Sequence, residues 1–323
     1  MNILEFKELA NQWGGNKIPF LFIIDFEMEK PLISPLSDID PEILFEINGF
    51  GNANQVTPKI NSLINIETCP VSFEVYQEKF AKVFEHLVYG NSFLANLTIK
   101  TRITLNADLL DVYHVSKARY KLYYKNQFLV FSPETFVSIR DGRIFSYPMK
   151  GTIDAGIPHA HHKILTDPKE LAEHITIVDL IRNDLSRVAT NVEVKCFRYL
   201  EEIHTQTKNL LQVSSEISGM LPPMYHKYVG DLLISLLPAG SISGAPKEKT
   251  IEIIREAEEE KRGYYTGVFG YFDGENLDSG VMIRYIEQDK GDYFYRSGGG
   301  LTARSNALAE YRETLDKIYV PVN

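Results

Sequence analysis

Cysteine is scarce in this sequence, since its 323 residues include only Cys69 and Cys196. Two cysteines cannot build a disulfide framework, and no Cys-x-x-Cys spacing occurs, which fits a reducing compartment. Long apolar runs are also lacking, because the longest, around Ile18–Phe26, is far shorter than a membrane-spanning helix. The first residues include acids where a signal peptide has basic and then apolar residues. These absences indicate a soluble, cytoplasmic protein.

Positive charge is the second deficit. Lysine and arginine number 34 against 43 aspartates and glutamates, which leaves a net charge of −9, and no block of basic residues reverses this locally. A net acidic chain repels nucleic-acid phosphates and anionic membrane surfaces, so we expect neither as a partner. Hydrophobic residues make up 44% of the chain, enough for the core of one large domain or of two ordinary ones.

What is present is a pattern of short strands and hairpin turns with helices between them. Asp141-Gly142 is a typical two-residue hairpin turn. The strongest helix signal covers Pro168–Val188, where Asp167 can cap the N-terminus and Pro168 suits the first helical position. Other predicted elements include the strands Ile18–Phe26 and Val281–Ile286 and the helix Asn306–Tyr319. Without repeats or linkers, this pattern favours an α+β fold with antiparallel or mixed sheets in one interwoven domain.

Lys150 lies in the stretch Pro148–Thr152, which follows a strand-like run. Pro148 on one side restricts the backbone, and Gly151 on the other side allows it to bend. One interpretation is a surface charge at the end of a strand. The other is an amine nucleophile, which attacks only when neutral and so needs a pKa lowered by burial or by a cationic neighbour. Lys150 alone leaves both interpretations open.

Two pairs of glutamates lie three residues apart in predicted helices: Glu170 with Glu173, and Glu310 with Glu313. The members of each pair therefore share one helix face. The pairs either form solvated acidic faces, with Glu170 completing a helix cap, or point into one cleft around a hard cation. Mg²⁺ takes oxygen ligands and typically uses one or two carboxylates, completed by water and substrate oxygens. The sequence does not show whether the two helices meet.

Two other features also have a plain and a functional interpretation. Glu134 lies in a predicted turn, where it is either solvated or, if buried, a general acid with a raised pKa. Gly298–Gly300 is either a loose connection between a strand and a helix or a cradle of N–H groups for an anion.

The segment Ser243–Lys247 is a tight start to a helix. Its N–H groups and Lys247 can hold an anion, or it is only a helix start. A histidine cluster, His159, His161 and His162, lacks a regular ligand spacing. We interpret it as a mobile, solvated loop and not as a metal site.

Taken together, these motifs resemble those of the chorismate-utilising enzymes, which include anthranilate, aminodeoxychorismate, isochorismate and salicylate synthases. The resemblance runs from about Asn91 to Ile318 in matching order. The matching segments are Ser132–Glu134, Pro148–Thr152, Lys169–His174, Val178–Leu185, Ser243–Lys247, Gly267–Tyr271, Ile283-Arg284, Gly298–Gly300 and Glu310–Thr314. The resemblance implies that family's α/β sandwich, with two large, mostly antiparallel sheets packed together and helices outside. Residues 1–90 are then a short N-terminal portion of the sandwich, and residues 91–320 are its chorismate-binding core.

Lys150 separates the branches within this family. The anthranilate branch is similar to Pro-Ile-Ala-Gly-Thr at this place, whereas the aminodeoxychorismate branch has Pro-Ile-Lys-Gly-Thr, which Lys150 matches. The isochorismate and salicylate branch has a water-activating lysine where this chain has Leu94. The resemblance therefore implies amination of chorismate to 4-amino-4-deoxychorismate, for para-aminobenzoate and folate, through a covalent adduct on Lys150. The alternatives are anthranilate synthesis and a non-catalytic chorismate-binding subunit.

The resemblance also implies roles for single residues. Mg²⁺ is expected at Glu173 and Glu313, with Glu170 and Glu310 behind them, and Glu134 is expected to protonate the departing 4-hydroxyl. The substrate-binding positions are expected to be Arg284, Tyr271, Gly298, Gly299, Gly300, Ser241, Lys247 and Thr152. Ammonia is expected from a glutamine amidotransferase partner subunit.

The chain departs from the family pattern in three places, one of which is the absence of a glutamine that is common near the position of Leu94. A family histidine falls at Asn209, which puts its acid/base role in doubt here. The part before about Asn91 is short and matches weakly. Because relatives carry tryptophan-binding elements in that part, we predict no tryptophan feedback site.

Overall fold

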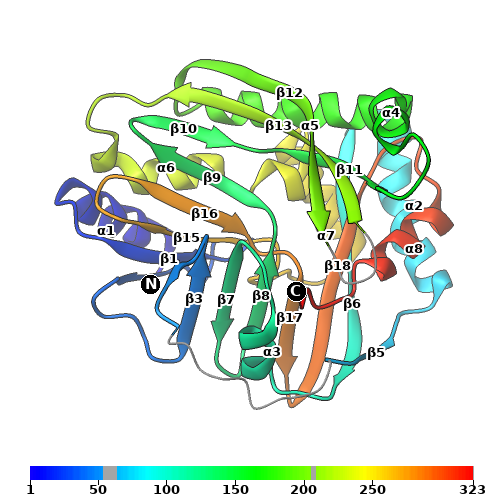
Figure 1. Cartoon of the computed structure of the whole chain (residues 1–323), viewed down its shortest axis with the longest axis horizontal. Helices are drawn as coiled ribbons and strands as arrows, with labels where there is room; N and C mark the ends of the chain where they lie inside the picture. The colour runs from blue at the N-terminus through cyan, green and yellow to red at the C-terminus, as the bar shows by residue number, and fades with distance from the viewer. Residues whose placement is uncertain (54–63, 205–208, 323) are drawn as a thin grey trace.

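Two sheets, each of nine strands among the residues that the structure describes, form the body of the protein. The structure is a computed structural model that describes residues 1–53, 64–204 and 209–322. Every strand pairing among these residues is antiparallel. Figure 1 shows one sheet in the upper half of the molecule and the other in the lower half, with helices around them. The expected α+β fold with mostly antiparallel sheets is confirmed.

The order of strands mixes early and late parts of the chain in both sheets. The upper sheet runs β11-β13-β10-β9-β16-β15-β1-β2, with β12 also on β13. Its strands are β1 (Phe20–Ile24), β2 (Leu32–Pro35), β9 (Thr135–Arg140), β10 (Arg143–Ser146), β11 (Met149–Asp154), β12 (Thr190–His204), β13 (Asn209–Met220), β15 (Val268–Phe272) and β16 (Leu277–Val281).

The lower sheet runs β14-β6-β18-β17-β8-β7-β3-β4, with β5 also on β6. Its strands are β3 (Ile43–Ile47), β4 (Phe50–Gly51), β5 (Ile66–Cys69), β6 (Leu94–Leu105), β7 (Tyr120–Tyr124), β8 (Phe128–Ser132), β14 (Gly244–Ala245), β17 (Tyr285–Asp289) and β18 (Asp292–Leu301). The first strands of the chain thus contribute to both sheets.

An aromatic-rich core joins the two sheets. Ile23 of β1 and Phe269 of β15 come from the upper sheet, and Phe45 of β3 and Tyr120 of β7 from the lower one. The rings of Tyr120 and Phe269 meet edge to face at 6.4 Å, an arrangement that contributes about 0.5–1.5 kcal/mol beyond the buried area. This core fixes one sheet against the other.

The helices pack around the sheets. They are α1 (Ile3–Gly15), α2 (Phe73–Tyr89), α3 (Leu109–Val115), α4 (Ala160–Thr166), α5 (Pro168–Ser186), α6 (Val229–Leu236), α7 (Lys247–Glu258) and α8 (Ala307–Asp316), with 3₁₀ turns η1 (Tyr225–Tyr228) and η2 (Gly240–Ile242). Helix α5 packs against β11, β12 and β13, α2 and α7 against β6, and α8 against β18. Asp167 caps α5 as predicted, accepting hydrogen bonds from Lys169 N and Glu170 N. No helix in the described ranges has both the length and the apolar character needed to cross a membrane.

Three local features differ from the sequence-based expectations. The predicted strand Val281–Ile286 is divided between β16 and β17, because Arg284 has a φ of 53°, which an extended strand does not allow. His161 and His162 are exposed as expected, but they lie in α4 and not in a loop. Helix α1 was not among the expected elements, although its capping box of Asn2 and Glu5 is a signal that the sequence carries.

Candidate active site

Lys150 lies in β11, where the pairing with β13 is irregular. One extra residue is accommodated between Met149 and Thr152 relative to the partner strand, which makes this part of β11 a bulge. Gly151 has a φ of 92°, a conformation that other residues rarely adopt. The Lys150 side chain is 26% exposed, and its Nζ lies 2.9 Å from Glu173 Oε2. The bulge therefore aims a largely buried amine at α5.

The two glutamate pairs come together beside this amine. Two acids come from each helix: Glu170 and Glu173 from α5, and Glu310 and Glu313 from α8. Lys169 Nζ lies 3.7 Å from Glu173 Oε1 and 3.8 Å from Glu310 Oε1, so it bridges the two helices. Lys150 interacts electrostatically with Glu173, Glu313 and Glu170. The structure thus places the four acids in one cluster, the arrangement that the sequence left open.

The acid cluster has the chemistry of a site for a hard cation. Glu170 Oε2 and Glu173 Oε1 are buried without a hydrogen bond to any described residue. Buried oxygens without such partners are costly, and carboxylate oxygens are the ligands that Mg²⁺ prefers. Within the described ranges, no three His, Cys, Asp or Glu side chains are already arranged to hold a metal ion together. The residues fit Mg²⁺ through their type and through two buried oxygens that accept no hydrogen bond from the described residues.

The charges of the cluster oppose a neutral amine at Lys150. Burial by itself lowers the pKa of Lys150, but the charges of Glu173, Glu313 and Glu170 outweigh burial and raise the pKa above its usual value. Burial raises the pKa of Glu170, and the neighbouring Glu173 adds to this increase. With only the protein's own groups present, Lys150 is therefore a charged counter-ion of Glu173.

Glu134 lies between β8 and β9 and has the environment of a general acid. Burial raises the pKa of its carboxyl group, while Ser241, Arg284 and Lys317 act in the opposite direction. Ser241 Oγ, in the 3₁₀ turn η2, donates a hydrogen bond to Glu134 Oε1. A carboxyl group with a raised pKa keeps its proton nearer to neutral pH and can donate it.

Arg284 and Lys317 bring positive charge to the same place. The Nε of Arg284 is buried and has no hydrogen-bond partner in the described part of the chain. Lys317 Nζ lies 2.8 Å from Glu313 Oε1 and donates to Gly298 O at 2.9 Å. Burial lowers the pKa of Lys317 despite the contact with Glu313. Sequence analysis missed Lys317, although its position four residues after Glu313 on a helix places it on the same face.

Tyr265 and Tyr271, which lie six residues apart in the chain, have different surroundings. Tyr271 lies in β15, and its ring packs 4.6 Å from that of Phe50 and 6.5 Å from that of Phe45. Tyr265 is buried and interacts electrostatically with Arg284, and burial raises its pKa to about 12. The structure therefore places Tyr265 beside Arg284, and Tyr271 against the exposed ring of Phe50 and the core ring of Phe45. The sequence motif Gly267–Tyr271 singled out Tyr271 and gave no signal for Tyr265.

The glycines Gly298–Gly300 lie inside β18 and not between a strand and a helix, which corrects their predicted location. They pair with β6, whereas β17 ends before reaching them, so no described strand covers their other edge. A Cβ atom on Gly299 would lie 3.6 Å from Glu310 Oε2, and one on Gly300 would lie 3.5 Å from Lys150 Nζ. The absent side chains leave room beside both the acids and the amine.

Three other residues that the sequence analysis named are Lys247, Asn209 and Thr152. Lys247 Nζ lies 2.7 Å from Asp184 Oδ2 and donates to a carbonyl at the end of α6. Asn209 is exposed at the start of β13, where it donates a hydrogen bond to Glu202 at 3.0 Å. Thr152 is exposed on β11. Lys247 and Asn209 thus already have partners of their own.

Residues 35–323 match the family model of the chorismate binding enzymes. The chain belongs to this family. It is therefore a chorismate-utilising enzyme by descent, and the match covers the acid cluster, Lys150 and Glu134 alike. The expected family membership is confirmed.

Relatives of known sequence divide into two groups. The chain is 51% identical to an "uncharacterized PabA-like protein" of Haemophilus influenzae, covering 98% of this chain and 96% of the relative. It is 34% identical to aminodeoxychorismate synthase component 1 of Escherichia coli, covering 76% of this chain but only 56% of that relative. It is 33% identical to anthranilate synthase component 1 of Synechocystis, covering 76% of this chain and 52% of that relative. The chain therefore spans about half the length of these two named synthases.

Solved structures show the same architecture. Anthranilate synthase component I of Streptococcus pneumoniae superposes with a TM-score of 0.68 at 26% identity, covering 80% of this chain and 59% of that one. The menaquinone-specific isochorismate synthase of Escherichia coli superposes with a TM-score of 0.73, covering 97% of this chain and 80% of that one. At 14% identity, the second similarity shows the fold alone.

Proposed function

We propose that the protein is the synthase component of an aminodeoxychorismate synthase and converts chorismate and ammonia into 4-amino-4-deoxychorismate. The observation that carries this proposal is the position of Lys150. Its amine lies 2.9 Å from the acid cluster at Glu173 and next to the open edge of the glycines in β18. The similarity to the Escherichia coli protein named aminodeoxychorismate synthase component 1 supports the same reaction.

Lys150 and Glu134 carry the first chemical step of this proposal. The Lys150 amine attacks ring C2 of chorismate, the ring double bonds shift, and the C4 hydroxyl leaves as water with a proton from Glu134. Ammonia then adds at C4 and expels the lysine amine, and the Glu134 carboxylate takes up a proton from the added ammonia. Two such displacements replace one difficult one, which is the advantage of covalent catalysis.

Mg²⁺ is the cofactor that the acid cluster suits best. Glu173 and Glu313 are the proposed ligands, with Glu170 and Glu310 orienting bound water behind them. A bound Mg²⁺ would supply positive charge for the ring carboxylate of chorismate and would favour the neutral form of a neighbouring amine. Glu173 also forms an ion pair with Lys150, so a cation held at Glu173 would compete with Lys150 for that carboxylate.

The positive and open groups around the cluster are proposed to hold the substrate. Arg284, whose Nε lacks a hydrogen bond among the described residues, and Lys317 both suit a carboxylate. The N–H groups along the open edge of Gly298–Gly300 suit the same anion. The hydrogen bond from Ser241 to Glu134 supports a place for Ser241 beside the reacting groups. We further propose that a separate glutamine amidotransferase subunit supplies the ammonia.

Identification of the product tests this proposal. The purified protein is incubated with chorismate, Mg²⁺ and an ammonium salt, and the products are separated by mass-coupled chromatography with and without an added aminodeoxychorismate lyase. We expect 4-amino-4-deoxychorismate without the lyase, and para-aminobenzoate with pyruvate only when the lyase is present. Anthranilate formed directly, with release of pyruvate, would contradict the proposal, as would binding of chorismate without turnover.

A further inference from the structure

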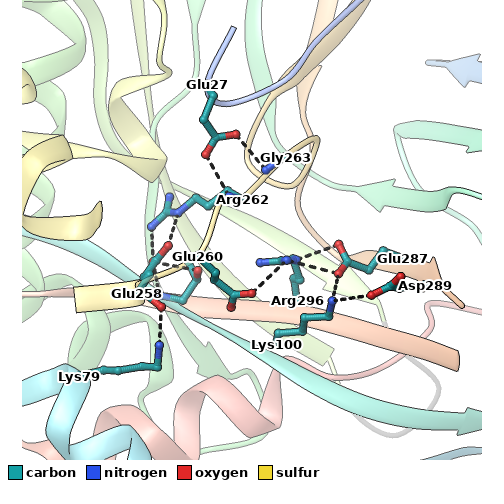
Figure 2. A network of polar contacts seen from close by, with 11 residues as sticks. Glu27, Lys79, Lys100, Glu258, Glu260, Arg262, Gly263, Glu287, Asp289 and Arg296 are labelled. Carbon is teal, nitrogen blue, oxygen red and sulfur yellow. Dashed lines mark hydrogen bonds and ion pairs between the residues drawn. The ribbon is translucent and has the colours of Figure 1, made fainter. Parts of the chain in front are cut away.

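A buried ion pair between Glu258 and Arg262 lies outside the reacting groups described above. Their side chains are 2% and 1% exposed, and Arg262 is the largest of the fully buried side chains. Arg262 Nη2 lies 2.6 Å from Glu258 Oε1, and Nε lies 2.9 Å from Glu258 Oε2, as Figure 2 shows. Removing both charges from water is costly, and the attraction between them offsets that cost only when their remaining hydrogen-bonding groups also find partners. Those partners indicate what the pair does.

The first set of partners is the free edge of β6. One edge of this strand pairs with β18, and the other is covered by β14 at its start and by β5 near its end. In the uncovered stretch, Glu258 Oε1 accepts hydrogen bonds from Thr98 N and Thr98 Oγ1, both at 2.8 Å. Arg262 Nη2 donates to Asn96 O at 2.6 Å. The ion pair thus satisfies a buried strand edge that no described strand covers.

The residues held in this way lie opposite the glycines of the candidate site. In the register of β6 and β18, Asn96 pairs with Gly300 and Thr98 pairs with Gly298. Gly300 is the position whose Cβ would lie 3.5 Å from Lys150 Nζ. The ion pair therefore holds the strand directly behind the open glycine edge.

The second partner of Arg262 is the turn that contacts Glu134. Arg262 Nη1 donates to Ile242 O at 2.9 Å. The preceding residue is Ser241, whose hydroxyl donates to Glu134. One planar guanidinium thus binds a carbonyl of η2 and a carbonyl of β6, and its geometry fixes how far apart they are.

Arg262 is itself held from the other side of the chain. Glu27 Oε1 accepts a hydrogen bond from Arg262 N at 3.0 Å, and Glu27 Oε2 accepts one from Gly263 N at 2.9 Å, as Figure 2 shows. The guanidinium also lies 4.7 Å from the centre of the Phe26 ring. These contacts fix the backbone from which the arginine side chain extends.

We infer that Glu258 and Arg262 are positioning residues that set the distance between Glu134 and the glycine edge beside Lys150. They touch no reacting group, and they act through Ser241 on one side and through β6 on the other. This inference rests on the proposed function only in assigning reacting roles to Glu134 and Lys150. The measured quantity is the rate at which chorismate is consumed, so the test does not depend on which product is formed.

Three variants test it. Arg262→Lys keeps the charge but loses the planar fork, and Glu27→Gln weakens the support of the Arg262 backbone while leaving the ion pair in place. We expect kcat for chorismate consumption to fall on the order of 10²-fold in Arg262→Lys, as for a displacement of about 1 Å at the reacting groups. In Glu27→Gln we expect a smaller fall, with KM for chorismate nearly unchanged in both. The matched control is Glu29→Gln. Glu29 lies two residues after Glu27, and its carboxylate forms an exposed ion pair with Lys261, so this variant should leave kcat unchanged.

A double-mutant cycle distinguishes positioning from a general loss of stability. If Arg262 acts through Ser241, then Ser241→Ala combined with Arg262→Lys should lose less than the product of the two single losses in kcat. Hydrogen exchange of segments 94–100 and 240–245 should rise in both Arg262→Lys and Glu27→Gln.

Wild-type turnover in both variants, or strictly multiplicative losses in the cycle, would overturn the inference. If Arg262→Lys does not fold, the kcat of Glu27→Gln relative to Glu29→Gln decides alone. Absence of chorismate consumption by the unaltered protein would instead contradict the proposed function.

Discussion

Lys150 Nζ lies 2.9 Å from Glu173 Oε2, so the proposed nucleophile and a proposed metal ligand neutralise each other. An amine in this ion pair is protonated and cannot attack, since its lone pair is occupied. The same carboxylate cannot fully serve both the ammonium group and a divalent cation. Metal binding and activation of the amine are therefore expected to be coupled, because a cation held by Glu173 would offset the main charge that raises the pKa of Lys150.

Replacement of Lys150 by methionine should abolish the covalent adduct. The unaltered protein, given chorismate and Mg²⁺ without ammonia, should gain the mass of dehydrated chorismate in intact mass spectrometry, and Lys150→Met should not. Turnover should fall by several orders of magnitude, because the nucleophile is gone. Lys169→Met is the control, since Lys169 also lies within 4 Å of Glu173 but is 48% exposed. An unchanged adduct in Lys150→Met would remove Lys150 from this role.

Without added metal, the adduct of the unaltered protein should form only slowly. The physical reason is the raised pKa of Lys150, which follows from Glu173, Glu313 and Glu170. Adduct formation measured by intact mass over a pH series should shift to lower pH when Mg²⁺ is added, because the amine then loses its proton more readily. A profile that Mg²⁺ does not move would contradict the coupling between metal and amine.

Glu134 should control the fall of activity at alkaline pH. A general acid acts only when protonated, so the rate should decrease as pH rises through the pKa of Glu134, which burial raises. Ser241 lowers that pKa through its hydrogen bond, so Ser241→Ala should move the descending limb to higher pH. Glu134→Gln should lose about 10²–10⁴-fold in kcat and show no such limb. A descending limb that stays in place in Ser241→Ala would contradict the assignment.

The sequence predicted the acid pairs, Lys150 and Glu134 because each has a local signal: helical spacing, a Pro/Gly-flanked strand end, or a turn. The i,i+4 spacing from Glu313 could have indicated Lys317, but no local signal indicated Tyr265 as a neighbour of Arg284, because its place depends on how the segment before β15 packs against the rest. The glycines of β18 show the same limit. Their composition is typical of a loop, but pairing with β6 makes them a strand. Tertiary pairing overrides local preference at such positions.

Tyr265 and Tyr271 offer a matched pair of hydroxyl deletions. Tyr265→Phe removes a buried hydroxyl beside Arg284 and should raise KM for chorismate several-fold, because a charged substrate group held there loses a hydrogen-bonding neighbour. Tyr271→Phe should change KM little, since its ring packs against Phe50 and Phe45. Steady-state kinetics of both variants provide the measurement. A larger effect at Tyr271 than at Tyr265 would support the assignment made from the sequence motif instead.

Replacement of Lys247 tests whether this residue stabilises the fold or binds the substrate. Its side chain is 12% exposed and pairs at 2.7 Å with Asp184, which is 11% exposed. Lys247→Met leaves Asp184 buried without its counter-ion, so the free energy of unfolding in urea should fall by about 3–5 kcal/mol. The dissociation constant for chorismate should stay unchanged under conditions where the variant is folded. Lys249→Met, which breaks an exposed pair with Glu252, is the control and should cost at most about 1 kcal/mol. Weaker chorismate binding by Lys247→Met at unchanged stability would instead place Lys247 at the substrate, as its sequence motif suggests.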